Sequence, residues 1–195
     1  MAISTSEYTN ALADALELEL AALTRAGVRI CGNTLSPVAL VKGELNEAEL
    51  AGEDLLSGAD GTALRAALER LGYAPEEFCA ISAVADRVQP GVEDAIARGE
   101  MLPPTLFREA VEALDPEAVI LLDEVAAQVM REAYASELAE IEQLDVAMLE
   151  PGLVAHVLGR RVLALGGFEA SLSDAREKQR MWAYLKLLPP AGAPY

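Results

Sequence analysis

Glu44 is the side chain whose position in the sequence points most directly to chemistry. It follows Val38–Val41, a short apolar run, β-branched at both ends, that suits a buried strand. In α/β proteins, ligands bind in the loops that leave the carboxyl ends of such strands. Backbone amides and a low dielectric at that place can adjust a carboxyl group for work as a general base. Glu44 is therefore a candidate catalytic residue, and a solvated loop acid is the alternative.

Other reactive side chains are few. His156 is the one histidine and lies in the apolar context VAHVL, so a structural or surface role is the simpler interpretation. The two cysteines, Cys31 and Cys79, form no CxxC pair, and the sequence contains no HExxH, Walker A or GxGxxG motif. We therefore expect no metal site and no cofactor. Two cysteines also make no disulfide framework, which favours reduced thiols in a cytoplasm.

The elements that would position Glu44 alternate between strand-like and helical patterns. Apolar runs predict four strands, and apolar residues at spacings of three and four predict helices between them. The expected strands are 38–41, 78–84, 118–122 and 161–165, and the expected helices are 5–26, 60–71, one from 105, one after 122, and 174–187. Continuous apolar strands that alternate with helices indicate a mainly parallel sheet covered on both faces. At 195 residues the chain fits one domain, 1–195, in which residues 134–158 are the hardest to assign.

Charge limits the classes of partner. The formal net charge is −17, which argues against strong binding of duplex DNA over the whole surface. The charge is uneven, because residues 151–195 carry six basic side chains and only three acidic ones. Four of the basic residues are candidates for phosphate contact: Arg160, Arg161, Arg176 and Lys178. The alternative is that this basic end pairs with the acidic body.

Targeting signals are not visible in the sequence. No run of 18 uncharged apolar residues exists, so we expect no membrane span. The first residues lack a basic segment followed by an apolar one, so we expect no secretory signal. These observations favour a cytoplasmic protein.

The loop around Glu44 resembles the first two motifs of the uracil-DNA glycosylase superfamily. Members of that family follow a strand with Gly-Glu-x-Pro-Gly, and this sequence keeps Gly43-Glu44 but continues with Leu45-Asn46 and lacks the Pro-Gly. A second family motif, Gly-x-Pro-Phe-x-Gly-x-x-Gly, resembles the segment 52–61. There Gly58 and Gly61 match glycines, one residue is inserted, and Leu55 stands where the family has the aromatic that stacks on the flipped base.

Later segments extend the resemblance over roughly residues 10–188. The family's second strand ends in Thr-Asn, whereas Ile81 is followed by Ser82-Ala83. The segment 116–130 is similar to the family's third strand and helix, and 174–186 is similar to its basic helix with a tryptophan. Counting back from that tryptophan, the family's His-Pro falls on Gly167 and Phe168.

The resemblance implies a fold and a candidate pocket. The fold is a three-layer α/β/α sandwich with a central, mainly parallel four-stranded sheet. The pocket would be lined by the residues at the motif positions: Gly43, Leu55, Gly58, Gly61, Ser82, Gly167 and Phe168. Glycosidic cleavage needs an extruded base, an aromatic against it and donors for the leaving anion, and the aromatic, the amide and the histidine are all replaced.

Two functions follow from this comparison. The first is a glycosylase-like protein that has lost efficient base excision and binds a nucleobase-like small ligand or a protein partner. The second is a divergent DNA glycosylase or nucleobase- or nucleotide-processing hydrolase, in which Glu44 positions water and residues 160–186 contact phosphate. A third interpretation, an acidic mimic of DNA, rests on charge alone. If Leu55 and Phe168 fill the pocket, no base can enter.

Overall fold

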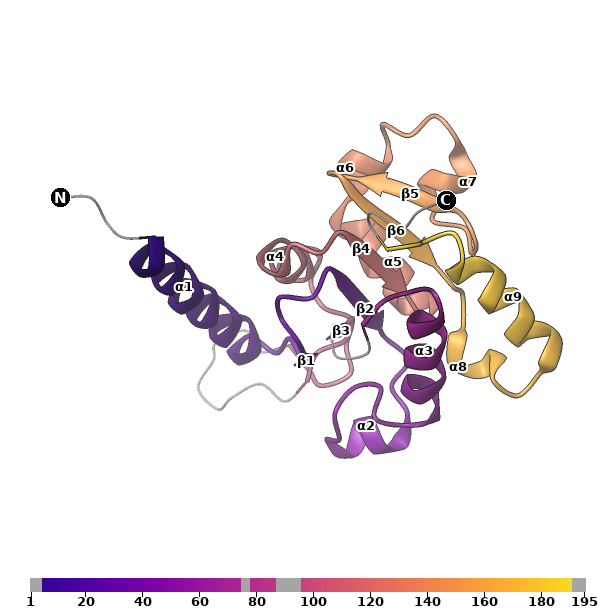
Figure 1. The fold of residues 1–195 in the computed structure, drawn as a ribbon, viewed down its shortest axis with the longest axis horizontal. Coiled ribbons are helices and arrows are strands. Elements are labelled where there is room, and N and C mark those ends of the chain that lie inside the picture. The colour runs from indigo at the N-terminus through magenta and orange to yellow at the C-terminus, as the bar shows by residue number, and fades with distance from the viewer. Residues whose placement is uncertain (1–4, 75–77, 87–95, 191–195) are drawn as a thin grey trace.

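A mixed α/β domain is seen in the computed structural model, which describes residues 5–74, 78–86 and 96–190 (Figure 1). Its strands are β1 (Ile30–Gly32), β2 (Val38–Lys42), β3 (Phe78–Ser82), β4 (Ala118–Leu121), β5 (Val154–Val157) and β6 (Arg160–Ala164). Its helices are α1 (Thr5–Arg25), α2 (Glu47–Ala51), α3 (Ala59–Arg70), α4 (Pro104–Leu114), α5 (Glu124–Ala133), α6 (Ala135–Leu138), α7 (Leu144–Ala147), α8 (Phe168–Ser171) and α9 (Ala175–Leu185).

The strands of the described chain form one six-stranded sheet in the order β1-β3-β2-β4-β6-β5. The four inner strands are parallel, and β1 and β5 pair antiparallel at the two edges. The expected mainly parallel sheet is confirmed, but the expected count of four strands is wrong. The two additional strands are only three and four residues long, and their residues are not continuously apolar and buried, so they carry little periodic signal.

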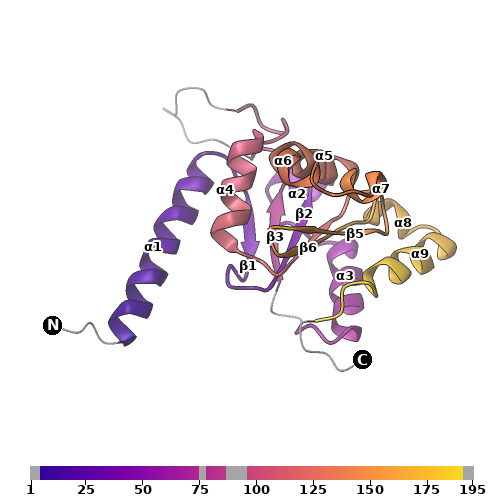
Figure 2. The ribbon, with the colours of Figure 1, turned by 90° about the horizontal axis from the view of Figure 1, so that it is seen from above.

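The inner strands are buried on both faces, which explains their uninterrupted apolar sequences. Every residue of β2, β3 and β4 is buried. Successive side chains point to opposite faces, so Ala39 and Val41 join the core under α4 and α5, while Val38 and Leu40 join the core under α3 and α9. Figure 2 shows α1, α4 and α5 on one side of the sheet and α3 and α9 on the other.

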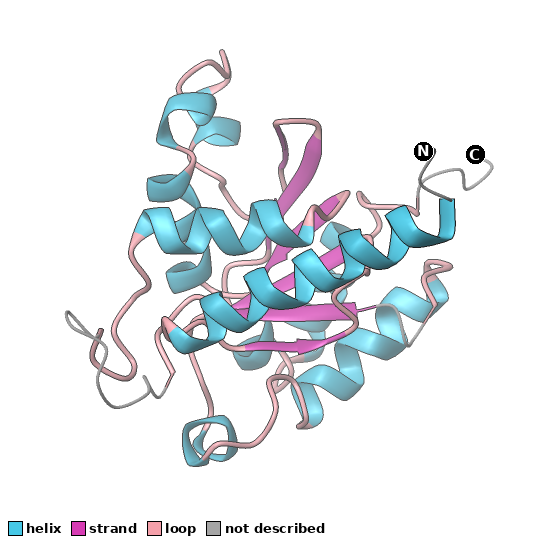
Figure 3. Cartoon of the chain, turned by 90° about the vertical axis from the view of Figure 1, so that its left-hand side faces the viewer, coloured by secondary structure: helices cyan, strands magenta, loops and turns pink. Residues whose placement is uncertain are grey.

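The elements expected from periodicity are present with end shifts of a few residues. The helix expected over 5–26 is α1, and that expected over 174–187 is α9. In Figure 3, α1 crosses the face of the sheet next to α4, and its amino-terminal end lies away from the strands. The segment 134–158 contains α6, α7 and β5. Within the described residues, no helix combines the length and the apolar character needed to span a membrane.

The turn between β5 and β6 contains a leucine in an unusual conformation. Leu158 and Gly159 connect the paired residues Val157 and Arg160, and both have positive φ, 48° and 83°. Two positive φ angles in a two-residue hairpin are typical of a type I′ turn, in which Asn-Gly is preferred. Leu158 is also 55% exposed, so its side chain contributes little packing.

We predict that Leu158→Asn stabilises the protein by about 0.5–1 kcal/mol, because asparagine tolerates the left-handed region better than leucine does. The measurement is the free energy of unfolding in urea. Leu187→Asn is the matched control, since Leu187 is 49% exposed and does not have positive φ. Equal effects of the two substitutions would contradict a turn-specific cause.

Candidate functional site

Lys42 occupies the place where the parallel strands end. It is the last residue of β2, follows four buried apolar residues, and is only 2% exposed itself. The loop from Gly43 leaves the sheet at this point, between the ends of β3 and β4. A buried ammonium group at the carboxyl ends of the strands is the central feature of the candidate site.

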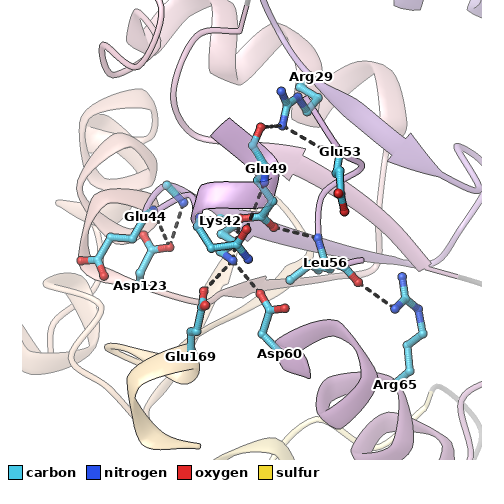
Figure 4. A network of polar contacts seen from close by, with 12 residues as sticks. Arg29, Lys42, Glu44, Glu49, Glu53, Leu56, Asp60, Arg65, Asp123 and Glu169 are labelled. Carbon is cyan, nitrogen blue, oxygen red and sulfur yellow. Dashed lines mark hydrogen bonds and ion pairs between the residues drawn. The ribbon is translucent and has the colours of Figure 1, made fainter. Parts of the chain in front are cut away.

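Three carboxylates surround the Lys42 ammonium (Figure 4). Its Nζ lies 2.6 Å from Asp60 Oδ2, 2.7 Å from Glu169 Oε2 and 2.8 Å from Glu49 Oε2. An ammonium has three protons to donate, so these three oxygens use its full capacity. We call Lys42, Glu49, Asp60 and Glu169 the Lys42 cluster.

Glu49 is held in place by the short helix α2. Asn46 and Glu49 form a capping box, in which Glu49 N donates to Asn46 Oδ1 and Asn46 N donates to Glu49 Oε2. The second carboxylate oxygen, Oε1, accepts from Leu56 N at 2.8 Å. Glu49 is fully buried, so one carboxylate fixes α2, the following loop and the lysine together.

Asp60 lies in the first turn of α3, where the helix dipole favours an acidic side chain. It is 2% exposed, and its Oδ2 accepts from Lys42. Its other oxygen, Oδ1, is buried and has no hydrogen-bond partner among the described residues. Glu169 of α8 completes the cluster from the solvent side, with a side chain that is 47% exposed.

The cluster keeps Lys42 charged. Burial disfavours the ammonium and acts to lower its pKa, but the hydrogen bonds to Asp60, Glu169 and Glu49 outweigh this effect, so the pKa of Lys42 is raised above its ordinary value. A lysine nucleophile or general base needs the opposite shift. The geometry therefore gives Lys42 a structural role.

Glu44, the candidate catalytic residue, has an exposed side chain, and its backbone amide is held by a hydrogen bond to Asp123. Asp123, the N-cap of α5, accepts hydrogen bonds from Gly43 N at 2.8 Å and Glu44 N at 3.0 Å through Oδ2, while its Oδ1 caps Ala126 N. These two loop amides are consequently occupied by a carboxylate. A Cβ at Gly43 would lie 2.5 Å from Val125 Cβ, so the glycine is required by close packing of the loop on α5.

The remaining motif positions lie in the core or in tight turns. Leu55 is 2% exposed, Phe168 is 4% exposed, and both belong to the apolar core under α3 and α9. Ser82 is buried, and its hydroxyl donates to Val84 O at 2.6 Å. A Cβ on Gly61 would lie 1.7 Å from Leu56 O, which again indicates packing. Gly58 precedes α3 as its N-cap, and Gly167 precedes α8 with φ 118°.

Little space is left between these groups. The cavity bounded by Lys42, Glu44, Asp60, Asp123 and Glu169 has a volume of about 20 Å³. That volume accommodates about one water molecule. The structure thus places Glu44, Gly167 and Phe168 around the same cavity, but protein atoms occupy nearly all of the space between them.

The four basic candidates do not form one cluster. Arg160 is 7% exposed and pairs with both carboxylate oxygens of Glu112, at 3.0 and 2.8 Å, and with Asp115 at 2.7 Å. Arg161 donates to Pro189 O, beyond the carboxyl end of α9. Arg176 and Lys178 are exposed in the first half of α9. Arg160 therefore pairs with the acidic body, as the alternative interpretation of the basic end expects.

The sequence analysis missed the Lys42 cluster. The available signal was a lysine that directly continues a buried strand, since a charged residue at such a place requires partners. Its partners come from segments up to 127 residues away, so no local spacing indicated them. Among the described residues, no group of histidine, cysteine or acidic side chains could hold a metal ion. His156 lies exposed on the edge strand β5.

A scan against protein-family models found no matching family, and a search of curated proteins found no match. The similarity to uracil-DNA glycosylases therefore rests on segment order and motif remnants, and it stays a prediction.

We predict that Lys42→Met destabilises the protein by about 3–5 kcal/mol at neutral pH, because two buried carboxylates lose their counter-charge. Adding Asp60→Asn should recover part of this loss, since it removes one of the unpaired charges. Urea unfolding of the single and double variants measures both effects. A double variant less stable than Lys42→Met would contradict the assignment.

The stability of the protein should fall in alkaline solution. The pKa of Lys42 is higher in the folded state than its ordinary value of 10.5, so its stabilising contribution is complete below pH 10.5. The contribution is lost as the pH rises through the folded-state pKa. Burial also raises the pKa of Tyr134, which reduces stability over the same range. The measurement is urea unfolding from about pH 9 to about pH 11.5. We expect a steeper decline in the wild type than in Lys42→Met/Asp60→Asn, and equal slopes would exclude Lys42 as the cause.

Proposed function

We propose that this protein is a uracil-DNA glycosylase-like, three-layer α/β/α domain, extending over 1–195, that lacks efficient base excision and acts by binding. The helices on both faces of the sheet and the parallel inner strands support the layered arrangement. The strand, loop and helix around Glu44 occur in the order that the resemblance predicts.

The observation that carries the proposal is the filled cavity at the ends of the strands. A glycosylase must admit an extruded base into a pocket there. In this chain Leu55 and Phe168 are buried in the core, and Glu169 reaches over the remaining space to Lys42. With about 20 Å³ left, a nucleobase could enter only if the Lys42 cluster were broken.

The chemistry at the motif positions points the same way. The stacking aromatic is replaced by Leu55. The family's Thr-Asn is replaced by Ser82-Ala83, so the base-reading amide is absent, and the Ser82 hydroxyl donates to Val84 O. The histidine position is Gly167, which has no side chain to donate to a leaving anion. Loss of one such donor typically costs about 2.7–4 kcal/mol of transition-state stabilisation.

The electrostatics support a ligand other than duplex DNA. The net charge is −17, and Arg160, which would belong to a phosphate-contacting segment, is neutralised by Glu112 and Asp115. A binding protein for a small ligand or a protein partner fits these charges better. A cytoplasmic location stays a prediction from the sequence.

We predict that the protein does not cleave uracil-containing oligonucleotides. Single- and double-stranded substrates would be incubated with the wild type and with Glu44→Ala, followed by alkaline cleavage, with an active uracil-DNA glycosylase as the positive control. Scission should stay at background for both proteins. Glu44→Ala should also leave the free energy of unfolding within about 0.5 kcal/mol, because the side chain is exposed.

Scission by the wild type that disappears in Glu44→Ala would overturn the proposal and favour a divergent hydrolase. Scission that persists in Glu44→Ala would overturn it as well, and would place the chemistry on another residue.

A further inference from the structure

A groove separate from the Lys42 cluster lies between α3 and α9. It has a volume of about 470 Å³, within the range of small-molecule sites. One wall is the alanine-rich face of α3, formed by Ala59, Ala63, Ala66 and Ala67, and the other is formed by Met181, Trp182 and Leu185 of α9. Phe168 of α8 also lines the groove.

The groove exists because the small alanine side chains of α3 leave space beside α9. The carboxyl ends of α3 and α9 are joined where the Tyr73 hydroxyl donates to Leu188 O at 2.9 Å. Leu64 and Leu68 of α3 point into the core, so the alanine positions face α9 and outward.

The charge of the groove is opposite to that of the protein. Its ionisable lining residues among those described are Arg70, in the last turn of α3, and Lys178, in the first half of α9. No carboxylate lines it within the described residues, although the whole chain carries 32 acidic residues against 15 basic ones. An apolar groove flanked only by cations is complementary to a ligand with an apolar body and an anionic head group.

We propose that this groove binds a small apolar carboxylate, such as a medium-chain fatty acid. The apolar chain would lie between the alanine face and Trp182, and the carboxylate would pair with Arg70 or Lys178. The groove is bounded by three helices, and α3 is only about 18 Å long, dimensions that suit a small molecule better than an extended macromolecular partner. This inference rests on the proposed function in one respect, that the protein acts by binding.

Trp182 is the one tryptophan of the chain and reports directly on the groove. Its fluorescence would be followed during titration with octanoate and, separately, with 1-octanol, which has the same chain and no charge. We expect a saturable change with octanoate and binding of 1-octanol that is weaker by about tenfold or more. High salt should weaken the binding of octanoate only.

Three variants locate the site. Ala66→Leu should abolish binding of both compounds without unfolding the protein, because Ala66 is exposed, lines the groove and lies on a helix that tolerates leucine. The double variant Arg70→Gln/Lys178→Gln should reduce the affinity for octanoate by about fivefold for each of the two cations that contacts the carboxylate. Its affinity for 1-octanol should be unchanged. Arg176→Gln, which removes a cation of α9 outside the groove, is the matched control and should bind octanoate as the wild type does.

Four outcomes would overturn the inference: no saturable response to octanoate, equal affinity for 1-octanol, unchanged binding in Ala66→Leu, or a response only to an acidic peptide. The oligonucleotide assay is independent of these measurements. If the protein binds octanoate and also excises uracil, the proposed function alone is rejected. If it shows neither octanoate binding nor uracil excision, this inference alone is rejected.

Discussion

The arrangement of the strand ends depends on one constraint, which is that the ammonium of Lys42 is buried and must remain charged. A buried ion without partners is unstable by several kcal/mol, so the surrounding chain has to supply counter-charges with suitable geometry. Glu49, Asp60 and Glu169 do this from α2, α3 and α8. The same cluster therefore fixes the positions of three helices relative to β2.

This constraint also determines what the strand ends can do. In an open α/β sheet, the crevice beyond the carboxyl ends of the strands is the usual place for a ligand. Here internal groups make the contacts that a ligand would otherwise make: Lys42 uses its donors on carboxylates, and Gly43 N and Glu44 N donate to Asp123. Asp60 Oδ1 is the buried atom of the cluster that is left without a partner among the described residues. A site whose donors are already satisfied gains little from binding a base.

Local sequence patterns predicted the inner strands because a strand that is buried on both faces has an uninterrupted apolar sequence. The runs at 38–41 and 118–122 are apolar at every position, and both correspond to inner strands. Edge strands such as β1 are short and partly exposed, so burial does not impose a pattern on them. The motif comparison assigned Phe168 to a pocket at the strand ends. In the structure Phe168 lines the small cavity there, and its side chain is buried in the core, which no motif indicates. The partners of Lys42 could not be predicted, since long-range ion pairs have no sequence period.

The same reasoning explains why the groove between α3 and α9 was not predicted. An alanine at every third or fourth position predicts a helix face but does not say whether the space above it is filled. Trp182 and Lys178 lie on a helix whose similarity to a known family suggested contact with nucleic acid, yet their surroundings are apolar and concave. In a chain with net charge −17, a concave apolar surface whose ionisable lining residues, among those described, are Arg70 and Lys178 favours an anion that the rest of the surface repels. Selectivity at this groove would then come from two terms together, burial of an apolar chain and pairing of one negative charge, and neither term requires the filled site at the ends of the strands.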